Sequence, residues 1–392
     1  MSAHTALFLL VNGLTNGAIY ALLGLGLVLI YNVTRVINIA QGEFVMLGVL
    51  TAVGLTGHAA AGGVHFAIIA GVIWAVLAAW KWRAWFWMPL ALLVGAVAWW
   101  GVLRLQPFHL SPLAAVVVSV LLVSFLGAAM YRIAIQPAAH ASELTFLIIT
   151  TGVFLAIQGF ALFLWGPGSF SFPPVSPGEF SLGVAKISHQ SVFVLGATLV
   201  LLLFIWLLLD RTLLGKALRA CAMNRLGARL VGISPERAGM LAFAISAGLT
   251  ALAAILLAPL PHPTYDMGLF LGLKGFVGAV IGGLSGYAGA VIGGLLVGVL
   301  EAYAFYGISA YGEAIVYGLI IVILLIRAVT QRRERAAEDR SAHLAHAARR
   351  VRAMRVRPML LHQAQREPRR DGEGDCQRKR HAEARVDRDR AH

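Results

Sequence analysis

Charged residues are scarce in this sequence. Asp, Glu, Lys and Arg make up 13% of its 392 residues, whereas hydrophobic residues make up 59%. A water-soluble domain carries about 25% charged residues, so this chain has too few to cover a globular surface. The mean hydropathy of +0.79 agrees with this interpretation. The composition therefore excludes a soluble domain and predicts that most of the chain faces lipid or other apolar helices.

The sequence also has few cysteines, no leader-like N-terminus and no nucleotide-binding motif. The two cysteines, Cys221 and Cys376, stand far apart without metal-type spacing, so we expect reduced thiols and no metal site. No basic region or obvious cleavage site precedes Asn12, so we expect the first apolar stretch to be retained as a span. Gly215-Lys216 lacks the upstream glycine of a P-loop, so we expect no bound nucleotide or other cofactor.

Apolar stretches that approach the ~20 residues of a bilayer crossing recur as far as Ile326. The candidate spans are 6–31, 42–57, 66–80, 88–103, 111–131, 143–165, 191–209, 238–260, a Gly-rich stretch 273–302, and 313–327. Basic connections favour the cytoplasmic side of a membrane. The loop 210–237 holds six Lys and Arg residues, which indicates that this loop is cytoplasmic and that the N-terminus is outside.

This orientation constrains the C-terminal part of the chain. The Arg-rich end can lie inside only if 273–302 enters the membrane and returns, as two short or broken segments turning near Ser285-Gly286-Tyr287. Broken backbone at membrane depth is tolerated where it packs in protein or lines a cavity. We therefore predict an all-α polytopic transmembrane bundle over residues 1–327, with a Gly-rich broken or re-entrant hairpin. Residues 327–392 hold 19 of the 32 Lys and Arg residues, and 328–392 are expected to form a basic, disordered cytoplasmic tail.

A polar stripe runs along the first span. Asn12, Asn16 and Tyr20 are spaced i, i+4 and i+8, so they share one helix face. Polar groups in hydrocarbon are costly without partners, so this face must meet another helix or water. Gly13 and Gly17 form a GxxxG that lets a neighbouring helix come close. Contact between helices is one interpretation of the stripe, and lining of a transport pathway is the other.

Glu43 stands at or just inside the cytoplasmic end of a short span. An acid in the membrane is a candidate functional group. The alternatives are a salt bridge to Arg35 or a favourable position at a helix N-terminus. Further along the chain, a run of GxxxG spacings from Gly278 to Gly298 permits close backbone packing. The same small residues could instead provide the sliding surfaces of alternating access.

The basic loop contains a helical pattern. We expect one helix over 217–231, with Gly232 and Pro235 as stop signals. Leu218, Ala222 and Leu226 would fall on one of its faces. Such a short amphipathic helix between two spans is suited to docking on a soluble partner. The alternative is a helix that rests on the membrane surface.

Four motifs, taken together and in this order, resemble one family. They are Asn12-Gly13-Leu14-Thr15 through Leu22, Val36-Ile37-Asn38 through Phe44, Ala217-Leu218-Arg219 through Ile233, and the Gly278-to-Gly294 run that ends at Glu301. They look like the LivH-like permeases of branched-chain amino acid ABC importers, over most of residues 6–326. Gln41 stands where that family usually has His, and the segment 82–104 looks additional or diverged.

The resemblance implies a multi-pass permease subunit of the bacterial inner membrane that works by alternating access and is not an enzyme. Implied partners are a second permease subunit in a heterodimer, two ATP-binding cassette subunits that hold ATP and Mg, and a periplasmic substrate-binding protein. Membrane lipid but no nucleic acid is expected. The implied coupling residues are Lys216, Arg219, Asn224, Arg225, Arg229 and Gly232. The candidate pathway residues are Asn12, Asn16, Tyr20, Asn38, Gln41, Glu43 and Glu301.

Other functions fit parts of the sequence. Related permeases also carry urea and short amides, and the sequence does not separate these from leucine, isoleucine or valine. An ion-coupled secondary transporter would place charged residues at mid-span, whereas Glu43 and Glu301 lie near predicted span ends. Gly283-Leu284-Ser285-Gly286 resembles the GxSG of rhomboid proteases, but no His that could act as a base follows before His343.

Overall fold

The structure is a computed structural model. It describes residues 3–60, 62–81, 87–105, 109–139, 141–174, 178–182, 185–259, 263–284 and 286–307, with a few isolated positions between 317 and 325. Residues 1–324 belong to one compact unit. Most of the predicted span 313–327 and the whole predicted tail 328–392 lie outside the described residues.

The described chain is mainly helical. Its elements are α1 (Ala3–Thr34), η1 (Ile39–Gly42), α2 (Glu43–Leu55), α3 (Gly62–Lys81), α4 (Trp87–Leu105), α5 (Pro112–Met130), η2 (Tyr131–Ile135), η3 (Gln136–Ala138), α6 (Glu143–Trp165), β1 (Glu179–Leu182), β2 (Ala185–Ser188), α7 (His189–Arg211), α8 (Leu213–Met223), α9 (Arg225–Leu230), α10 (Pro235–Leu257), α11 (Met267–Gly282) and α12 (Tyr287–Gly307). Within the described ranges, seven helices are long and apolar enough to cross a membrane: α1, α3, α5, α6, α7, α10 and α12. The apolar helical stretches Ile39–Leu55, Met88–Arg104 and Met267–Gly282, in η1–α2, α4 and α11, are shorter. The predicted polytopic helical bundle is therefore confirmed.

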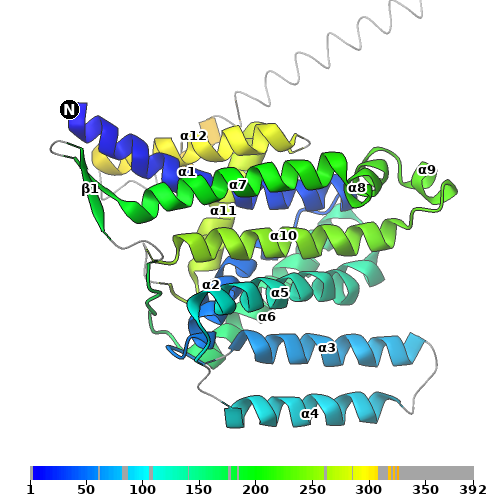
Figure 1. Cartoon of the computed structure of the whole chain (residues 1–392). Coiled ribbons are helices and arrows are strands. Elements are labelled where there is room, and N and C mark those ends of the chain that lie inside the picture. The colour runs from blue at the N-terminus through cyan, green and yellow to red at the C-terminus, as the bar shows by residue number, and fades with distance from the viewer. Residues whose placement is uncertain are drawn as a thin grey trace, which may run out of the picture. The chain divides into compact units, whose positions relative to one another are not determined.

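Helix α1 lies at the centre of the bundle. In its most apolar 18-residue window 89% of the residues are buried, against 11% in that of α6. It packs against α12, α10 and α11. Figure 1 shows α1, α7, α10 and α12 running along a common direction that α11 crosses, with the α3–α4 pair at one edge. Of the polar stripe on the first span, Tyr20 therefore faces protein, whereas Asn12 and Asn16 are half-buried.

Glycine allows the close approach of α1, α11 and α12. A Cβ atom at Gly17 would lie 2.8 Å from Leu295 Cα, and one at Gly278 would lie 2.7 Å from Gly294 Cα. Both distances are shorter than a carbon–carbon contact, so neither position has room for a side chain. These glycines provide the close backbone packing that their spacing predicts.

The helical path is interrupted between α11 and α12, near the predicted turn at 285–287. Gly283 ends α11 with a φ of +86°, a conformation that glycine adopts readily. Helix α12 has 21 residues and is one of the seven long helices, so the second segment of the predicted hairpin is not short. Re-entry of α11 into the membrane stays a prediction.

A short β-hairpin interrupts the helical pattern between α6 and α7. Strands β1 and β2 pair antiparallel, with Glu179 opposite Ser188 and Leu182 opposite Ala185. The predicted all-α fold did not include this hairpin, so the structure differs from the prediction here. Its four-residue strands are too short to give a clear alternating pattern in the sequence.

Candidate functional site

Helix α1 presents the first three candidate pathway residues. Asn12 and Asn16 are half-buried, and Tyr20 is buried. The Nζ atom of Lys274, on α11, lies 5.7 Å from the centre of the Tyr20 ring. This is within the range of a cation–π contact, so the inner end of the polar stripe faces α11.

A second polar group joins η1 to α10. The Gln41 Nε2 atom donates hydrogen bonds to Ser246 Oγ at 2.9 Å and to Thr250 Oγ1 at 2.6 Å. Asn38 Nδ2 in turn donates to Gln41 Oε1 at 3.4 Å. All four side chains are buried. The structure therefore brings Asn38 and Gln41 together, and it adds Ser246 and Thr250, which the sequence interpretation missed.

Ser246 and Thr250 carry a signal that could have been found. They are spaced i, i+4 within the predicted span 238–260, which places both hydroxyls on one helix face. Hydroxyl side chains often hydrogen-bond between membrane helices. A search for polar pairs at this spacing in every span would have detected them.

Glu43 is fully buried at the first turn of α2. Neither carboxyl oxygen has a hydrogen-bond partner among the residues that the structure describes. The proposed salt bridge to Arg35 does not form; the Arg35 guanidinium donates instead to the backbone oxygen of Ala222 at 3.3 Å. A position at a helix N-terminus is the alternative that agrees with the structure. Gly268, in the first turn of α11, packs directly against the Glu43 carboxyl group.

Glu301 lies in a buried ion pair. Its Oε1 atom is 2.5 Å from Lys274 Nζ, and both side chains are almost inaccessible to solvent. The sequence interpretation missed Lys274, although it is a lone lysine in a Gly-rich apolar stretch and such a residue is a functional candidate by itself. Lys274 lies at the middle of α11, so a charged residue stands inside this apolar helix. Because Lys274 neutralises it, Glu301 is not a free carboxylate.

The basic loop folds as two helices, α8 and α9, separated by Asn224; we call these residues, 213–230, the elbow. The expected single helix over 217–231 is wrong, because Asn224 leaves the helical conformation and its Oδ1 accepts a hydrogen bond from the backbone N–H of Gly227 at 3.0 Å. Asn is a strong N-cap residue, so Asn224 starts a new helix. The helical segment ends near the predicted stop at Gly232: α9 ends at Leu230, and Gly232 has a φ of +83°.

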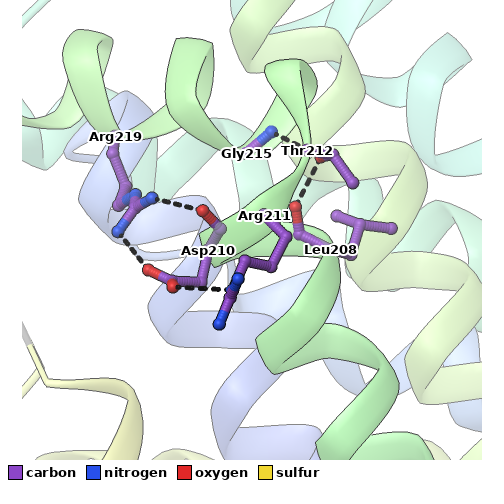
Figure 2. Close-up of polar contacts among 6 residues, drawn as sticks. All are labelled: Leu208, Asp210, Arg211, Thr212, Gly215 and Arg219. Atoms are coloured by element: carbon purple, nitrogen blue, oxygen red, sulfur yellow. Dashed lines mark hydrogen bonds and ion pairs between the residues drawn. The ribbon is translucent and has the colours of Figure 1, made fainter.

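Polar contacts anchor the beginning of the elbow (Figure 2). Thr212 caps α8, its Oγ1 accepting from the backbone N–H of Gly215 at 3.1 Å. Arg219 Nη1 lies 2.8 Å from Asp210 Oδ1, and Arg219 Nη2 donates to the Asp210 backbone oxygen at 3.1 Å. Of the basic candidates in the elbow, Arg219 is thus tied to the end of α7, while Lys216 and Arg229 are exposed.

The break at Asn224 changes which side chains share a face. Leu218 is buried, but Leu226 is 69% exposed, so the predicted face of Leu218, Ala222 and Leu226 is not continuous. Large apolar side chains instead cover the outer surface of the elbow: Leu213, Met223, Leu226 and Leu230, with Val231 following directly. Exposed apolar groups of this kind, next to exposed arginines, are typical of an interaction surface.

A hollow of about 580 Å³ adjoins the elbow. It is lined by residues of the α1 end, η2, η3, α6, α9 and the α10 start, among them Val33, Ile135, Gln136, Arg225 and Glu236. Gln136 Nε2 donates to Glu236 Oε2 at 2.8 Å, which ties η3 to α10 across the hollow. Among the described residues no group of three His, Cys, Asp or Glu side chains could hold a metal ion.

Comparison with known proteins identifies the family. The family described as the permease component of branched-chain amino acid transport systems matches residues 9–85 and 88–325. The chain is 29% identical over 327 residues to BraD of Pseudomonas aeruginosa, a high-affinity branched-chain amino acid transport system permease protein, covering 81% of this chain and 92% of the relative. It is 27% identical over 326 residues to the LivH permease proteins of Escherichia coli K12 and Salmonella typhimurium, covering 80% of this chain and 91% of each relative.

No solved structure matches this chain. The family match nevertheless extends over most of the sequence, and it includes the polar groups of α1, η1 and α11 together with the elbow. The chain therefore belongs to the family of permease components of branched-chain amino acid transport systems.

Proposed function

We propose that this multi-pass membrane protein is one of two permease subunits of an ABC importer in the bacterial inner membrane. It would move leucine, isoleucine, valine or a similar apolar amino acid, delivered by a periplasmic binding protein. Two ATP-binding cassette subunits would supply the energy, so ATP and Mg would be bound by these partners and this chain would carry no cofactor. Family membership supports this assignment, and the relatives' names supply the substrate class.

The elbow is the observation that carries the energetic part of the proposal. It is a folded structure anchored at its beginning to the end of α7, yet its outer surface exposes Met223, Leu226 and Leu230 together with basic side chains. A surface of this kind has the features of a docking site for a soluble subunit. Because the sequence contains no P-loop, energy must enter through a partner or an ion gradient. We assign Lys216, Arg219, Asn224, Arg225, Arg229 and Gly232 to this docking region.

The substrate pathway is proposed to run beside α1. Asn12 and Asn16 are half-buried there. Asn38, Gln41 and Glu43 are buried in the neighbouring η1–α2 segment. Glu43 has the chemistry to meet the ammonium group of an amino acid, because its carboxyl oxygens have no other partner among the described residues. Tyr20 and Glu301 would act through Lys274 rather than by binding substrate directly.

An ion-coupled transporter is the second candidate, since the Lys274–Glu301 pair places charges inside the bundle. A transport assay separates the two. Proteoliposomes would contain this chain, its partner permease and the two ATPases, with the loaded binding protein added outside. We expect leucine uptake to require internal ATP and to persist after an ionophore collapses all ion gradients.

Two further transport results and one binding measurement bear on the proposal. Urea in place of leucine identifies the substrate class. Uptake by this chain alone without ATP would contradict the proposal, and so would ATPase binding that survives deletion of 216–233.

A further inference from the structure

We propose that Arg35 and Arg225 form a reciprocal clasp that carries movement of the elbow into α1; this rests on the proposed function, since an ATPase would drive that movement. Arg225 Nη2 donates a hydrogen bond to the backbone oxygen of Val33 at 2.8 Å. Arg35 Nη2 donates one to the backbone oxygen of Ala222 at 3.3 Å. The two bonds run in opposite directions between the end of α1 and the end of α8.

Each arginine satisfies the C-terminal end of a helix across the clasp: Arg225, the first residue of α9, bonds the end of α1, and Arg35, which follows α1, bonds the end of α8. The last carbonyl groups of a helix have no partner within it, and they carry the negative end of the helix dipole. Neither α1 nor α8 has a basic residue in its own last turn. Arg225 therefore supplies the cation for α1, and Arg35 supplies it for α8. Hydrogen bonds from a charged donor are stronger than neutral ones, so the two helix ends are held together.

The backbone of Arg35 indicates that its side chain matters. Arg35 has a φ of +59°, and it is the one non-glycine residue with a positive φ in the described part of the chain. Helices commonly end with a residue in this left-handed conformation, but that residue is usually glycine or asparagine because a Cβ atom makes it costly. Arg35 adopts this unfavourable backbone conformation, and its side chain forms the hydrogen bond to Ala222 from there.

The clasp joins the elbow to the end of α1 beside an open space. Arg225 and Val33 both line the hollow of about 580 Å³, where α9 faces Ile135, Gln136 and Phe146 across open space. Helix α1 is continuous from Ala3 to Thr34 and presents Asn12, Asn16 and Tyr20. A rigid helix transmits displacement from one end to the other, so movement at Val33 reaches the proposed pathway.

Substitution of Arg35 separates transmission from docking, because Arg35 lies outside the exposed surface of the elbow. The complete transporter would be reconstituted with Arg35→Gln or Arg35→Lys. The control is Arg211→Gln, which removes an exposed charge at the start of the basic loop 210–237. Loss of one charge-assisted hydrogen bond is expected to lower leucine uptake per ATP hydrolysed about tenfold in Arg35→Gln. Bound ATPase and the rate of ATP hydrolysis should stay unchanged, and Arg35→Lys should recover part of the uptake. Wild-type uptake per ATP in Arg35→Gln would overturn the clasp.

A chemical probe tests the clasp without any transport. Cys221 is buried in the last turn of α8, next to Ala222. Burial raises the pKa of its thiol, an effect that nearby Arg225 partly opposes, so reaction with maleimide should be slow. In a Cys376→Ser background, we expect Arg35→Gln to speed labelling of Cys221 several-fold and Arg211→Gln to leave it unchanged.

An unchanged labelling rate in Arg35→Gln would show that the clasp does not hold α8. Failure of the proposed function gives a different pattern. In that case the wild-type complex would show no ATP-dependent uptake, while the labelling difference between Arg35→Gln and Arg211→Gln would remain.

Discussion

At the scale of single residues, the Lys274–Glu301 pair is the largest concentration of buried charge described in the chain. Its ammonium and carboxylate groups are 2.5 Å apart, and the ring of Tyr20 lies beside the ammonium. Two charges inside an apolar bundle lose their hydration, and each depends on the other to compensate for that loss. The pair therefore joins α11 to α12 and leaves little net charge at this depth.

Breaking this pair on one side should destabilise the protein more than removing both charges. Lys274→Met or Glu301→Gln alone leaves a buried group without its partner and should cost about 3–5 kcal/mol. The double variant should recover much of this loss. Heating in detergent followed by size-exclusion chromatography measures the stability, and Lys216→Met, which removes an exposed charge, is the control. Single variants as stable as the wild type would show that the pair contributes nothing.

At the scale of elements, the close contact between α1 and α12 depends on glycine. A Cβ atom at Gly17 would lie 2.8 Å from Leu295 Cα, so Gly17→Ala must push α1 away from α12. We expect it to cost about 1–3 kcal/mol through overpacking. Gly152 lies on α6 with nothing within 4 Å of an added Cβ atom. Gly152→Ala should therefore be neutral or slightly stabilising in the same heating assay, because alanine favours a helix. Equal behaviour of the two variants would contradict the close packing of α1 and α12.

The elbow depends on its own cap. Asn224 accepts the hydrogen bond that starts α9, and loss of an N-cap costs about 1 kcal/mol. In Asn224→Ala the amides of residues 225–230 should exchange hydrogen faster, whereas Asn224→Asp should retain their protection because a carboxylate also caps a helix. Hydrogen exchange followed by mass spectrometry reports this region directly. Unchanged exchange in Asn224→Ala would mean that contacts with α10 alone hold α9.

At the scale of the whole molecule, the bundle presents two kinds of apolar surface. Side chains such as those of α6 and α7 are suited to lipid, whereas Met223 and Leu230 protrude from the elbow with 88% and 82% of their surface exposed. Met223→Glu and Leu230→Glu are expected to weaken ATPase binding at least about tenfold, because each buries a charge in the proposed interface. Neither should change the stability of the isolated subunit, since neither side chain contacts the core.

Copurification with the ATPases at increasing salt and detergent washes measures this binding. Lys216→Glu is a useful comparison, because it changes a charge within the elbow without removing an apolar side chain. ATPase retention by Met223→Glu and Leu230→Glu at the wild-type level would remove the exposed apolar surface from the proposed interface.

The sequence by itself determined the membrane class, most helix positions and the glycine contacts. These features are local: apolar length specifies a span, and glycines at GxxxG spacing line one helix face wherever the helix packs. The polar candidates were also found locally, since asparagine, glutamine and glutamate are conspicuous in hydrocarbon. Their partners were not found in this way.

Only the tertiary structure decided which residues meet. Lys274 pairs with Glu301, and Gln41 bonds Ser246 and Thr250. Arg35 bonds the end of α8 and not the carboxyl group of Glu43. Each of these contacts depends on the relative depth and rotation of two helices. Periodicity along one helix does not encode these quantities, because the residues that fix them belong to another helix far away in the chain. The break at Asn224 also depends on contacts that the sequence pattern does not show: the Asn224 side chain caps α9, and Arg219 ties α8 to the end of α7.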